Sequence, residues 1–192
     1  MYVKSDREDR DRIDADDLSL VRRTVRGDRG AFGALVDRYQ KPIYNVALRI
    51  VKNPEDAEDI AQTVFMKAYQ KLDGFDERYR FFSWIYRIAI NESLNFSTRR
   101  RSFEALEPSM QSAVDSPEEE TIKLDKEERV GDAILELEPE DRAIVILKHF
   151  QGFSYAEIGF ILNIPEKTVK SRLYTARQRL KDVLTRMGYF NK

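Results

Sequence analysis

Residues that can recognise a nucleic acid recur at intervals of three and four between Lys167 and Arg177. They are Lys167, Lys170, Ser171, Tyr174 and Arg177. Ammonium and guanidinium groups bind phosphates and guanine edges, and hydroxyl groups bond to bases or phosphates. Apolar residues at 169, 173, 176 and 180 keep the same spacing, which predicts a helix with one buried stripe. The chemistry that this surface offers is hydrogen bonding and charge neutralisation.

The preceding segment predicts a second helix and a tight turn. Ser154 and Glu157 form a capping-box pattern. Asn163-Ile164-Pro165 predicts the end of that helix, and Pro165 is suited to open the next one. Gly159 would let the two helices approach closely. This layout is typical of a helix-turn-helix, whose second helix enters the DNA major groove. Two packed helices of an ordinary bundle are the alternative.

Composition argues against several other kinds of chemistry. The 192 residues include no cysteine and one histidine, so thiolate metal sites and cysteine nucleophiles are excluded. His149 precedes Gly152 and is interpreted as a helix-end residue. The sequence contains no run of about 18 apolar residues, so no membrane span is predicted. The charged N-terminus is unlike a signal segment. We expect a cytoplasmic protein with no cofactor, no metal and no catalytic residue.

Charge is segregated along the chain although the net charge is only −1. Residues 104–141 contain fourteen acidic and three basic residues, whereas 166–186 contain seven basic and two acidic ones. Such asymmetry suggests different partners for different segments. Residues 102–125 have the composition of a flexible linker between two domains, which could extend over about 80 Å. Such a linker either runs along the surface of a partner or is a spacer that makes no contacts.

The N-terminal half is predicted to be helical from residue 17 onward. Residues 1–16 carry charges of both signs without an apolar period, so they are expected to form a disordered tail. Helices are predicted at 16–26 and 29–39, with another that starts at Pro42 and closes at Asn53. Asn53 and Pro54 then predict the start of a helix that runs to about Leu72.

The helix after Asn53 carries acidic side chains on its outer face. Asp56, Asp59, Gln62 and Met66 are spaced by three or four and so form one exposed row, which we call the acidic ridge. Such a ridge would suit a basic partner. Acidic residues also stabilise helix N-termini through the helix dipole, so capping alone is the alternative.

Residues 75–101 combine aromatic and basic side chains. Aromatic faces stack on unpaired bases at about 1–3 kcal/mol each, and arginines hold the phosphates. A helix predicted from about Phe82 displays Arg87, Asn91 and Asn95 along one edge and ends in three arginines. An aromatic core with a basic last turn explains the pattern equally well.

Four sequence blocks together resemble bacterial sigma factors of the extracytoplasmic-function (ECF) type. The blocks are GDRGAFGALVDRYQKPIY, NPEDAEDIAQTVFMKAYQKLDGF, FSWIYRIAINESLNF with its trailing arginines, and LEPEDRAIVILKHFQGFSYAEIGFILNIPEKTVKSRLYTARQRLK. The resemblance implies an all-α fold of two helical domains. Residues 17–101 would form a region 2-like domain for core-polymerase binding and for recognition and melting of the minus-ten element. Residues 126–187 would form a region 4-like helix-turn-helix domain for the minus-thirty-five element.

The resemblance also implies partners and individual site residues. The residues that it implies for contact with the clamp coiled coil of the largest subunit of core RNA polymerase are Asp56, Asp59, Gln62, Phe65 and Met66. Minus-ten DNA binding falls to Arg78, Arg80, Trp84, Arg87, Asn91, Arg99, Arg100 and Arg101, with Asn91 at a position associated with a flipped base. Minus-thirty-five binding falls to Lys148, Lys167, Thr168, Lys170, Ser171, Tyr174 and Arg177. Family members are commonly held inactive by an anti-sigma factor, often membrane-bound, and do not themselves insert into the membrane.

The sequence departs from the family pattern at two places. The loop at 76–80 is DERYR, whereas many relatives have a smaller loop that contains Gly or Ser. The identity of the base that this loop prefers therefore stays open. Thr175 stands where some relatives carry an arginine, so one contact with DNA is expected to be missing. A helix-turn-helix repressor or activator with an N-terminal sensor domain is the alternative function, and a nucleic-acid enzyme is disfavoured for lack of metal ligands.

Overall fold

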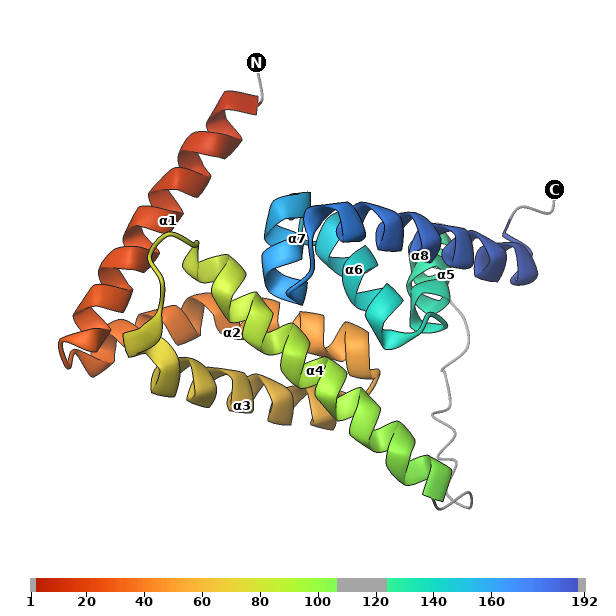
Figure 1. The fold of residues 1–192 in the computed structure, drawn as a ribbon, viewed down its shortest axis with the longest axis horizontal. Helices are drawn as coiled ribbons and strands as arrows, with labels where there is room; N and C mark the ends of the chain where they lie inside the picture. The colour runs from red at the N-terminus through yellow and green to blue at the C-terminus, as the bar shows by residue number, and fades with distance from the viewer. Residues whose placement is uncertain (1–2, 107–123, 190–192) are drawn as a thin grey trace. The chain divides into compact units, whose positions relative to one another are not determined.

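All regular structure in the part of the chain described here, residues 3–106 and 124–189 of a computed structural model, is helical (Figure 1). The elements are α1 (Val3–Val25), α2 (Arg29–Val51), α3 (Pro54–Lys71), the 3-10 helix η1 (Leu72–Gly74), α4 (Phe81–Leu106), α5 (Leu124–Leu135), α6 (Pro139–His149), α7 (Tyr155–Leu162) and α8 (Glu166–Arg186). The predicted all-α class is confirmed. Within these ranges no helix has the length and apolarity needed to cross a membrane.

The chain divides into two compact units. The first consists chiefly of α1, α2, α3 and the first half of α4, and the second chiefly of α5 to α8. Most of the predicted linker, residues 107–123, lies outside the described residues. Its first five residues, 102–106, continue α4, and residues 124–125 open α5.

In the first unit, α2, α3 and α4 enclose an apolar core. Its fully buried side chains include Leu35, Ile43, Val46, Val64, Ala68, Ile85, Tyr86 and Ile90. Helices α2 and α3 run antiparallel, because Phe32 near the start of α2 packs edge-on against Tyr69 near the end of α3, with 4.9 Å between ring centroids (Figure 1). Helix α3 begins as predicted, since the Asn53 side chain accepts a hydrogen bond of 3.0 Å from the Asp56 amide.

Helix α2 continues through Pro42, where the sequence predicted a break. An interior proline removes one backbone hydrogen bond and costs about 3 kcal/mol. The apolar stripe nevertheless crosses Pro42 without interruption, because Leu35, Tyr39 and Ile43 are all buried on it. Full burial of each large apolar side chain is worth about 1.5–3 kcal/mol, so tertiary packing outweighs the local penalty.

Helix α1 begins at Val3, although residues 1–16 were predicted to form a disordered tail. A buried carboxylate anchors it: Asp17 is inaccessible to solvent and accepts hydrogen bonds from the Tyr39 hydroxyl and the Arg38 guanidinium. Burial raises the pKa of Asp17, while the bonds from Tyr39 and Arg38 oppose that rise. The charges of residues 1–16 were interpreted as a solvated tail because their partners lie far away in the sequence: Asp16 pairs with Arg38 of α2, and Asp14 pairs with Arg80.

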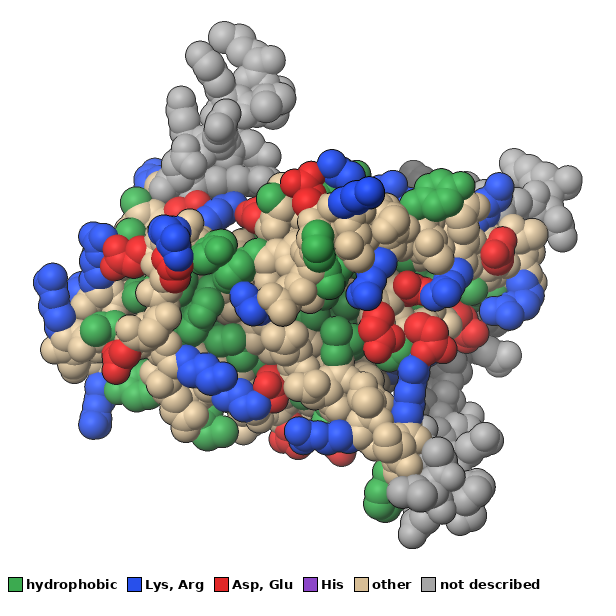
Figure 2. Space-filling view, in the orientation of Figure 1, with side chains coloured by type: hydrophobic (Ala, Val, Ile, Leu, Met, Phe, Trp, Pro, Cys, Tyr) green, Lys and Arg blue, Asp and Glu red, His purple; other side chains and the backbone are tan. Residues whose placement is uncertain are grey.

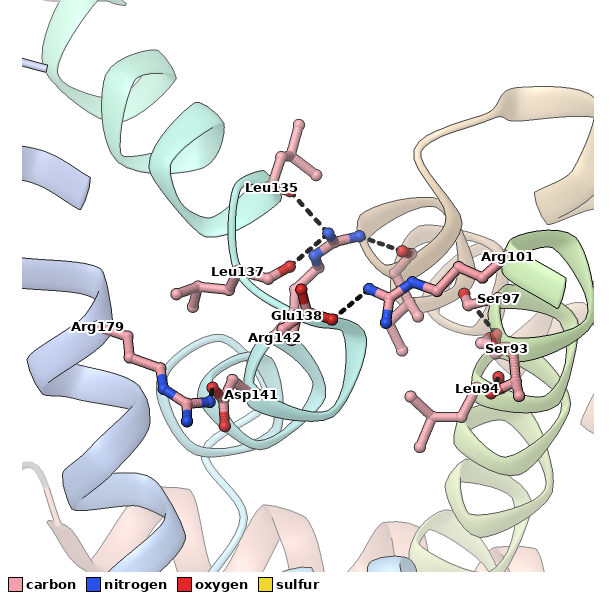
Figure 3. Close-up of polar contacts among 12 residues, drawn as sticks. Ser93, Leu94, Ser97, Arg101, Leu135, Leu137, Glu138, Asp141, Arg142 and Arg179 are labelled. Atoms are coloured by element: carbon pink, nitrogen blue, oxygen red, sulfur yellow. Dashed lines mark hydrogen bonds and ion pairs between the residues drawn. The ribbon is translucent and has the colours of Figure 1, made fainter. Parts of the chain in front are cut away.

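The second unit contains a buried arginine that sequence patterning did not single out. Arg142 on α6 is 4% exposed and donates to the carbonyl groups of Ile134 at 3.2 Å and of Leu135 and Leu137 at 2.7 Å (Figure 3). The carbonyls of Ile134 and Leu135 end α5 and that of Leu137 lies just beyond it, so the guanidinium caps that helix. Burial lowers the pKa of Arg142 to about 10, which leaves it charged at neutral pH. Arg179 on α8 is paired with Asp141 beside it (Figure 3).

The predicted helix-turn-helix is present as α7 and α8. Glu157 accepts a 2.8 Å bond from the Ser154 amide, and the Ser154 hydroxyl accepts a 3.2 Å bond from the Glu157 amide, which confirms the capping box. The turn contains Asn163 in the left-handed region, at φ +54°. A Cβ added at Gly159 would lie 2.8 Å from the Ile164 carbonyl oxygen. The close approach predicted for Gly159 is therefore confirmed.

Candidate protein and nucleic-acid interfaces

The acidic ridge lies on the outer side of α3. Asp59, Gln62 and Met66 are exposed and Asp56 is partly exposed, with Met66 at 56%. Phe65 is half-buried beside them and lines an open groove of about 770 Å³ between α3 and α2. Carboxylates, an amide, a thioether and an aromatic ring thus share one surface, which suits a partner that presents both basic and apolar groups.

The α2 wall of this groove was missed by sequence reasoning. It consists of Val36, Gln40, Lys41 and Tyr44, opposite Glu58, Ala61, Gln62 and Phe65 of α3. Residues 36, 40 and 44 have the i, i+4, i+8 spacing of one helix face. The predicted break at Pro42 assigned them to two helices and so hid the signal.

The residues predicted to bind the minus-ten element lie on one loop and on one helix. Arg78 and Arg80 belong to the loop at 75–80 that leads into α4. Trp84, Arg87 and Asn91 follow on α4 at intervals of three and four, so they share one face. Arg99, Arg100 and Arg101 are exposed further along the same helix, about 25 Å beyond Trp84 at 1.5 Å per residue. The candidate residues therefore form a track rather than a pocket.

The aromatic cluster of this segment is partly core and partly surface. Phe81 and Tyr86 are buried, whereas Tyr79 is 43% exposed. Half-buried Trp84 contacts Phe75 edge-on, with 5.3 Å between ring centroids. The core interpretation is confirmed for Phe81 and Tyr86. The Tyr79 ring stacks on Phe160, with 4.0 Å between ring centroids, and a role of this segment in nucleic-acid binding stays a prediction.

Within the loop, Arg78 is tied to Asp76. Arg78 donates from Nε at 3.0 and 2.9 Å and from Nη2 at 2.6 Å to the Asp76 carboxylate. These bonds hold the pKa of Asp76 below its ordinary value. The Arg78 side chain is nevertheless 84% exposed, so it could exchange this carboxylate for a phosphate.

The residues predicted to bind the minus-thirty-five element gather on α8. Lys167, Lys170, Ser171, Tyr174 and Arg177 are exposed there, Thr168 is partly exposed, and Figure 2 shows Lys and Arg side chains along this helix. Lys170 donates to Glu166 at 2.8 Å, an interaction that raises its pKa. Lys148 instead donates to the Phe153 carbonyl at 3.1 Å and lies over the Tyr155 ring, so it braces the start of α7.

Arg177 contacts the only histidine of the chain. Its Nε and Nη2 lie 3.2 and 3.1 Å from His149 Nε2, which accepts the hydrogen bond when the proton is on Nδ1. His149 is the last residue of α6, as predicted. Burial, together with the charges of Arg177 and Lys148, lowers the pKa of His149. The neutral imidazole therefore orients Arg177.

We expect the second unit to lose a little stability as the pH falls from about 7.5 to 5.5. Since the folded-state pKa of His149 lies below the unfolded value of about 6.5, the unfolded chain binds the proton more readily. The contribution of His149 to stability is fully present above the pKa of the unfolded chain and is lost as the pH falls below that pKa. His149→Gln, whose amide oxygen can still accept from Arg177, should flatten the decline in thermal unfolding of the full chain. Equal declines in both proteins would assign the effect to other groups.

Among the residues that the structure describes, no three His, Asp or Glu side chains are grouped so that they could hold a metal ion. The chemistry available on these surfaces is ion pairing, hydrogen bonding and aromatic stacking. Each is a means of binding nucleic acid or protein.

Two family models match the chain in the expected order. Residues 35–103 match sigma-70 region 2, and residues 127–180 match sigma-70 region 4. The chain is 34% identical to the ECF RNA polymerase sigma factor SigW of Bacillus subtilis, over 85% of this chain and 94% of the relative. It is 35% identical to the ECF RNA polymerase sigma-E factor of Escherichia coli K12, over 85% and 92%.

Solved structures agree with these matches. CnrH, in complex with the cytosolic domain of CnrY, superposes with a TM-score of 0.66 at 26% identity and covers 90% of this chain and 98% of its own. The sigma factor RpoE of Bartonella quintana, in complex with the anti-sigma factor NepR, gives a TM-score of 0.62 at 26% identity, with coverage of 80% and 96%.

The chain therefore belongs to the sigma-70 family, with regions 2 and 4 both present. Within that family it is a sigma factor of the ECF type, which directs promoter recognition by RNA polymerase. Sigma factors are not enzymes, so the work of this protein is done by binding.

Proposed function

We propose that the first unit docks on core RNA polymerase through the acidic ridge and the adjoining groove, and that both units contact the promoter. In this assignment the loop at 75–80 and one face of α4 bind and help open the minus-ten element. Helix α8 binds the minus-thirty-five element from the major groove. The protein acts in the cytoplasm, where its polymerase and promoter partners are found.

Docking through α3 is supported by the character of its surface. Exposed Met66 and Tyr69, at 56% and 48%, lie on a helix whose first turn carries Asp56. Large apolar side chains left open on a helix that also carries carboxylates are typical of protein interfaces. The preferred partner surface is a helix or coiled coil with basic side chains, because charge complementarity accelerates and orients association.

Promoter opening is assigned to binding energy rather than to covalent chemistry. Extruding a base from the duplex costs about a few kcal/mol, and stacking on an aromatic side chain returns about 1–3 kcal/mol per base. Half-buried Trp84 supplies a ring on the arginine-bearing track of α4. Asn91 is exposed on that helix and offers both a donor and an acceptor to a base edge.

The observation that carries the DNA-binding proposal is the exposed face of α8. Its lysines, hydroxyl groups and Arg177 lie outside the buried stripe Val169, Leu173 and Ala176, which fixes the helix against its own domain. A helix held in this way by a tight turn presents its first two turns to base edges and its later turns to the phosphate backbone.

An anti-sigma factor is a further proposed partner. CnrH and RpoE were solved in complexes with CnrY and NepR, respectively. We extend the same kind of pairing to this chain, because the exposed apolar and acidic side chains of α3 would need cover when polymerase is absent.

The test of the α8 assignment separates base reading from phosphate anchoring. Lys170→Ala should cost about 1–3 kcal/mol on the cognate minus-thirty-five element and flatten the preference at one or two base pairs. Arg177→Ala should weaken all sequences about equally and reduce the slope of log affinity against log salt by about one unit. Both variants are assayed as holoenzyme against single-base promoter substitutions at several salt concentrations.

The neighbouring exposed residue Gln178 provides a matched control, since Gln178→Ala should change neither the base preference nor the salt slope. A changed base preference in Arg177→Ala, together with an unchanged one in Lys170→Ala, would contradict the proposed docking of α8 in the groove.

A further inference from the structure

Helix α1 contacts the loop at 75–80 at two places. Arg22 donates from Nε and Nη2 to the two carboxylate oxygens of Glu77, at 2.9 and 2.6 Å. One end of the loop is held by Asp14, whose Oδ2 lies 2.6 Å from Arg80 Nε. The side chains of Asp14 and Arg80 are only 24% and 33% exposed. Two ion pairs between residues far apart in the sequence thus tie the loop to α1.

Helix α1 is a fixed support for these contacts. Asp17, which lies between the two loop-binding residues, is buried against Arg38 and Tyr39 of α2. The Tyr39 ring in turn packs on Phe81, where the loop enters α4, with 5.6 Å between ring centroids. Both α1 and the end of the loop are therefore anchored to the same point of the core.

In the middle of the loop the Tyr79 ring stacks on Phe160, with 4.0 Å between ring centroids. On the side of α1 a cavity of about 210 Å³ remains, lined by Asp14, Ala15 and Leu18 of α1 and by residues 75 and 77–81. Because packing against α1 is incomplete there, the two ion pairs fix where the loop lies relative to α1. Arg78 and exposed Tyr79 lie between the two tied residues, so they move with them.

We propose that Arg22 and Asp14 are positioning residues that hold the loop at 75–80 and thereby set its discrimination between bases of the unpaired minus-ten strand. This inference rests on the proposed function of the loop. Neither residue needs to touch DNA. The effect of these ion pairs on base preference is limited by their strength, because an exposed ion pair shifts an equilibrium by about two- to fivefold. Both residues therefore adjust the base preference and do not create it.

The structure offers a matched control in the adjacent arginine. Arg23 donates to Asp28 at 3.0 and 2.7 Å, across the turn that follows α1. Arg22→Glu and Arg23→Glu therefore make the same change of charge one residue apart, but only the first removes a contact with the loop. Glu77→Arg breaks the Arg22 pair from the other side, and the double variant Arg22→Glu with Glu77→Arg restores an ion pair of reversed polarity.

The experiment uses the full chain bound to core RNA polymerase and a promoter fork whose minus-ten non-template strand is single-stranded. Affinities are measured for all four bases at each minus-ten position, and amide hydrogen exchange is followed at residues 75–80 without DNA. Arg22→Glu and Glu77→Arg should each reduce base discrimination about two- to fivefold and speed exchange in the loop. The double variant should recover both, and Arg23→Glu should change neither.

The outcomes separate this inference from the function on which it rests. Discrimination that stays unchanged in Arg22→Glu and Glu77→Arg would overturn it, whether or not exchange in the loop increases. A double variant as impaired as the single ones would also overturn it, because a lost fold would then explain the defect. If the unaltered protein shows no preference among bases, the proposed role of the loop is itself wrong.

Discussion

Replacing Asp56 and Asp59 by lysine should weaken binding to core RNA polymerase by at least about tenfold, because like charges brought together at an interface cost several kcal/mol. The two carboxylates lie at the start of α3, Asp59 exposed and Asp56 partly so. Acidic side chains also favour a helix N-terminus by about 0.3–1 kcal/mol each, so some stability will be lost. Affinity for core is measured by titration of labelled protein, and circular dichroism shows whether helicity is kept.

The control for this prediction is Asp37→Lys with Asp73→Lys. Both residues are exposed in the same unit and lie off the ridge, so the net charge changes equally. The control should bind core much as the unaltered protein does. A ridge variant that folds well and keeps full affinity for core would contradict docking through α3.

Replacing Gly159 by alanine should disable the helix-turn-helix. The added Cβ would lie 2.8 Å from the Ile164 carbonyl oxygen, and that atom belongs to the backbone of the turn rather than to a flexible side chain. Overpacking of this kind typically costs about 1–3 kcal/mol, and the shift needed to relieve it changes the angle of α8. We expect lower stability of the second unit and loss of preference for the minus-thirty-five element.

Gly131→Ala is the matched substitution for Gly159→Ala. Gly131 lies inside α5, where an added Cβ would meet nothing within 4 Å. Alanine in a helix interior is favoured over glycine by about 0.5–1 kcal/mol, so this variant should be slightly more stable than the unaltered protein. Thermal unfolding and promoter binding check both variants. Normal binding to the minus-thirty-five element in Gly159→Ala would show that the turn tolerates the change.

The helix-turn-helix could be predicted closely because its signals are local. The capping box, the proline that precedes α8 and the close approach at Gly159 all involve residues within a few positions of one another. Each follows from backbone geometry and from hydrogen bonds of the nearest turn. The same holds for the Asn53 cap of α3.

Features that depend on distant partners could not be predicted in this way. The break expected at Pro42 does not occur, because the cost of the proline is offset by burial against helices elsewhere in the chain. Residues 1–16 were interpreted as a tail because Asp14 and Asp16 find Arg80 and Arg38 only in the folded unit. The capping role of Arg142 is likewise invisible in a periodic pattern.

The candidate binding surfaces also combine local features that the sequence predicted with features that depend on distant residues and were not predicted. Spacing placed the acidic ridge on one face of α3 and the basic residues on α8. It could not show that Val36, Gln40 and Tyr44 form the opposite wall of the groove, since that requires knowledge of how two helices pair. Nor could it show that α1 reaches the loop at 75–80.

The most direct test of the sigma-factor assignment is transcription with core RNA polymerase that lacks any other sigma factor. The protein and core are mixed with a library of duplex promoter fragments, and the start sites of the RNA products are mapped. We expect specific initiation downstream of a shared pair of minus-thirty-five and minus-ten elements, dependent on the protein. Core that initiates no more specifically with the protein than without it would contradict the assignment.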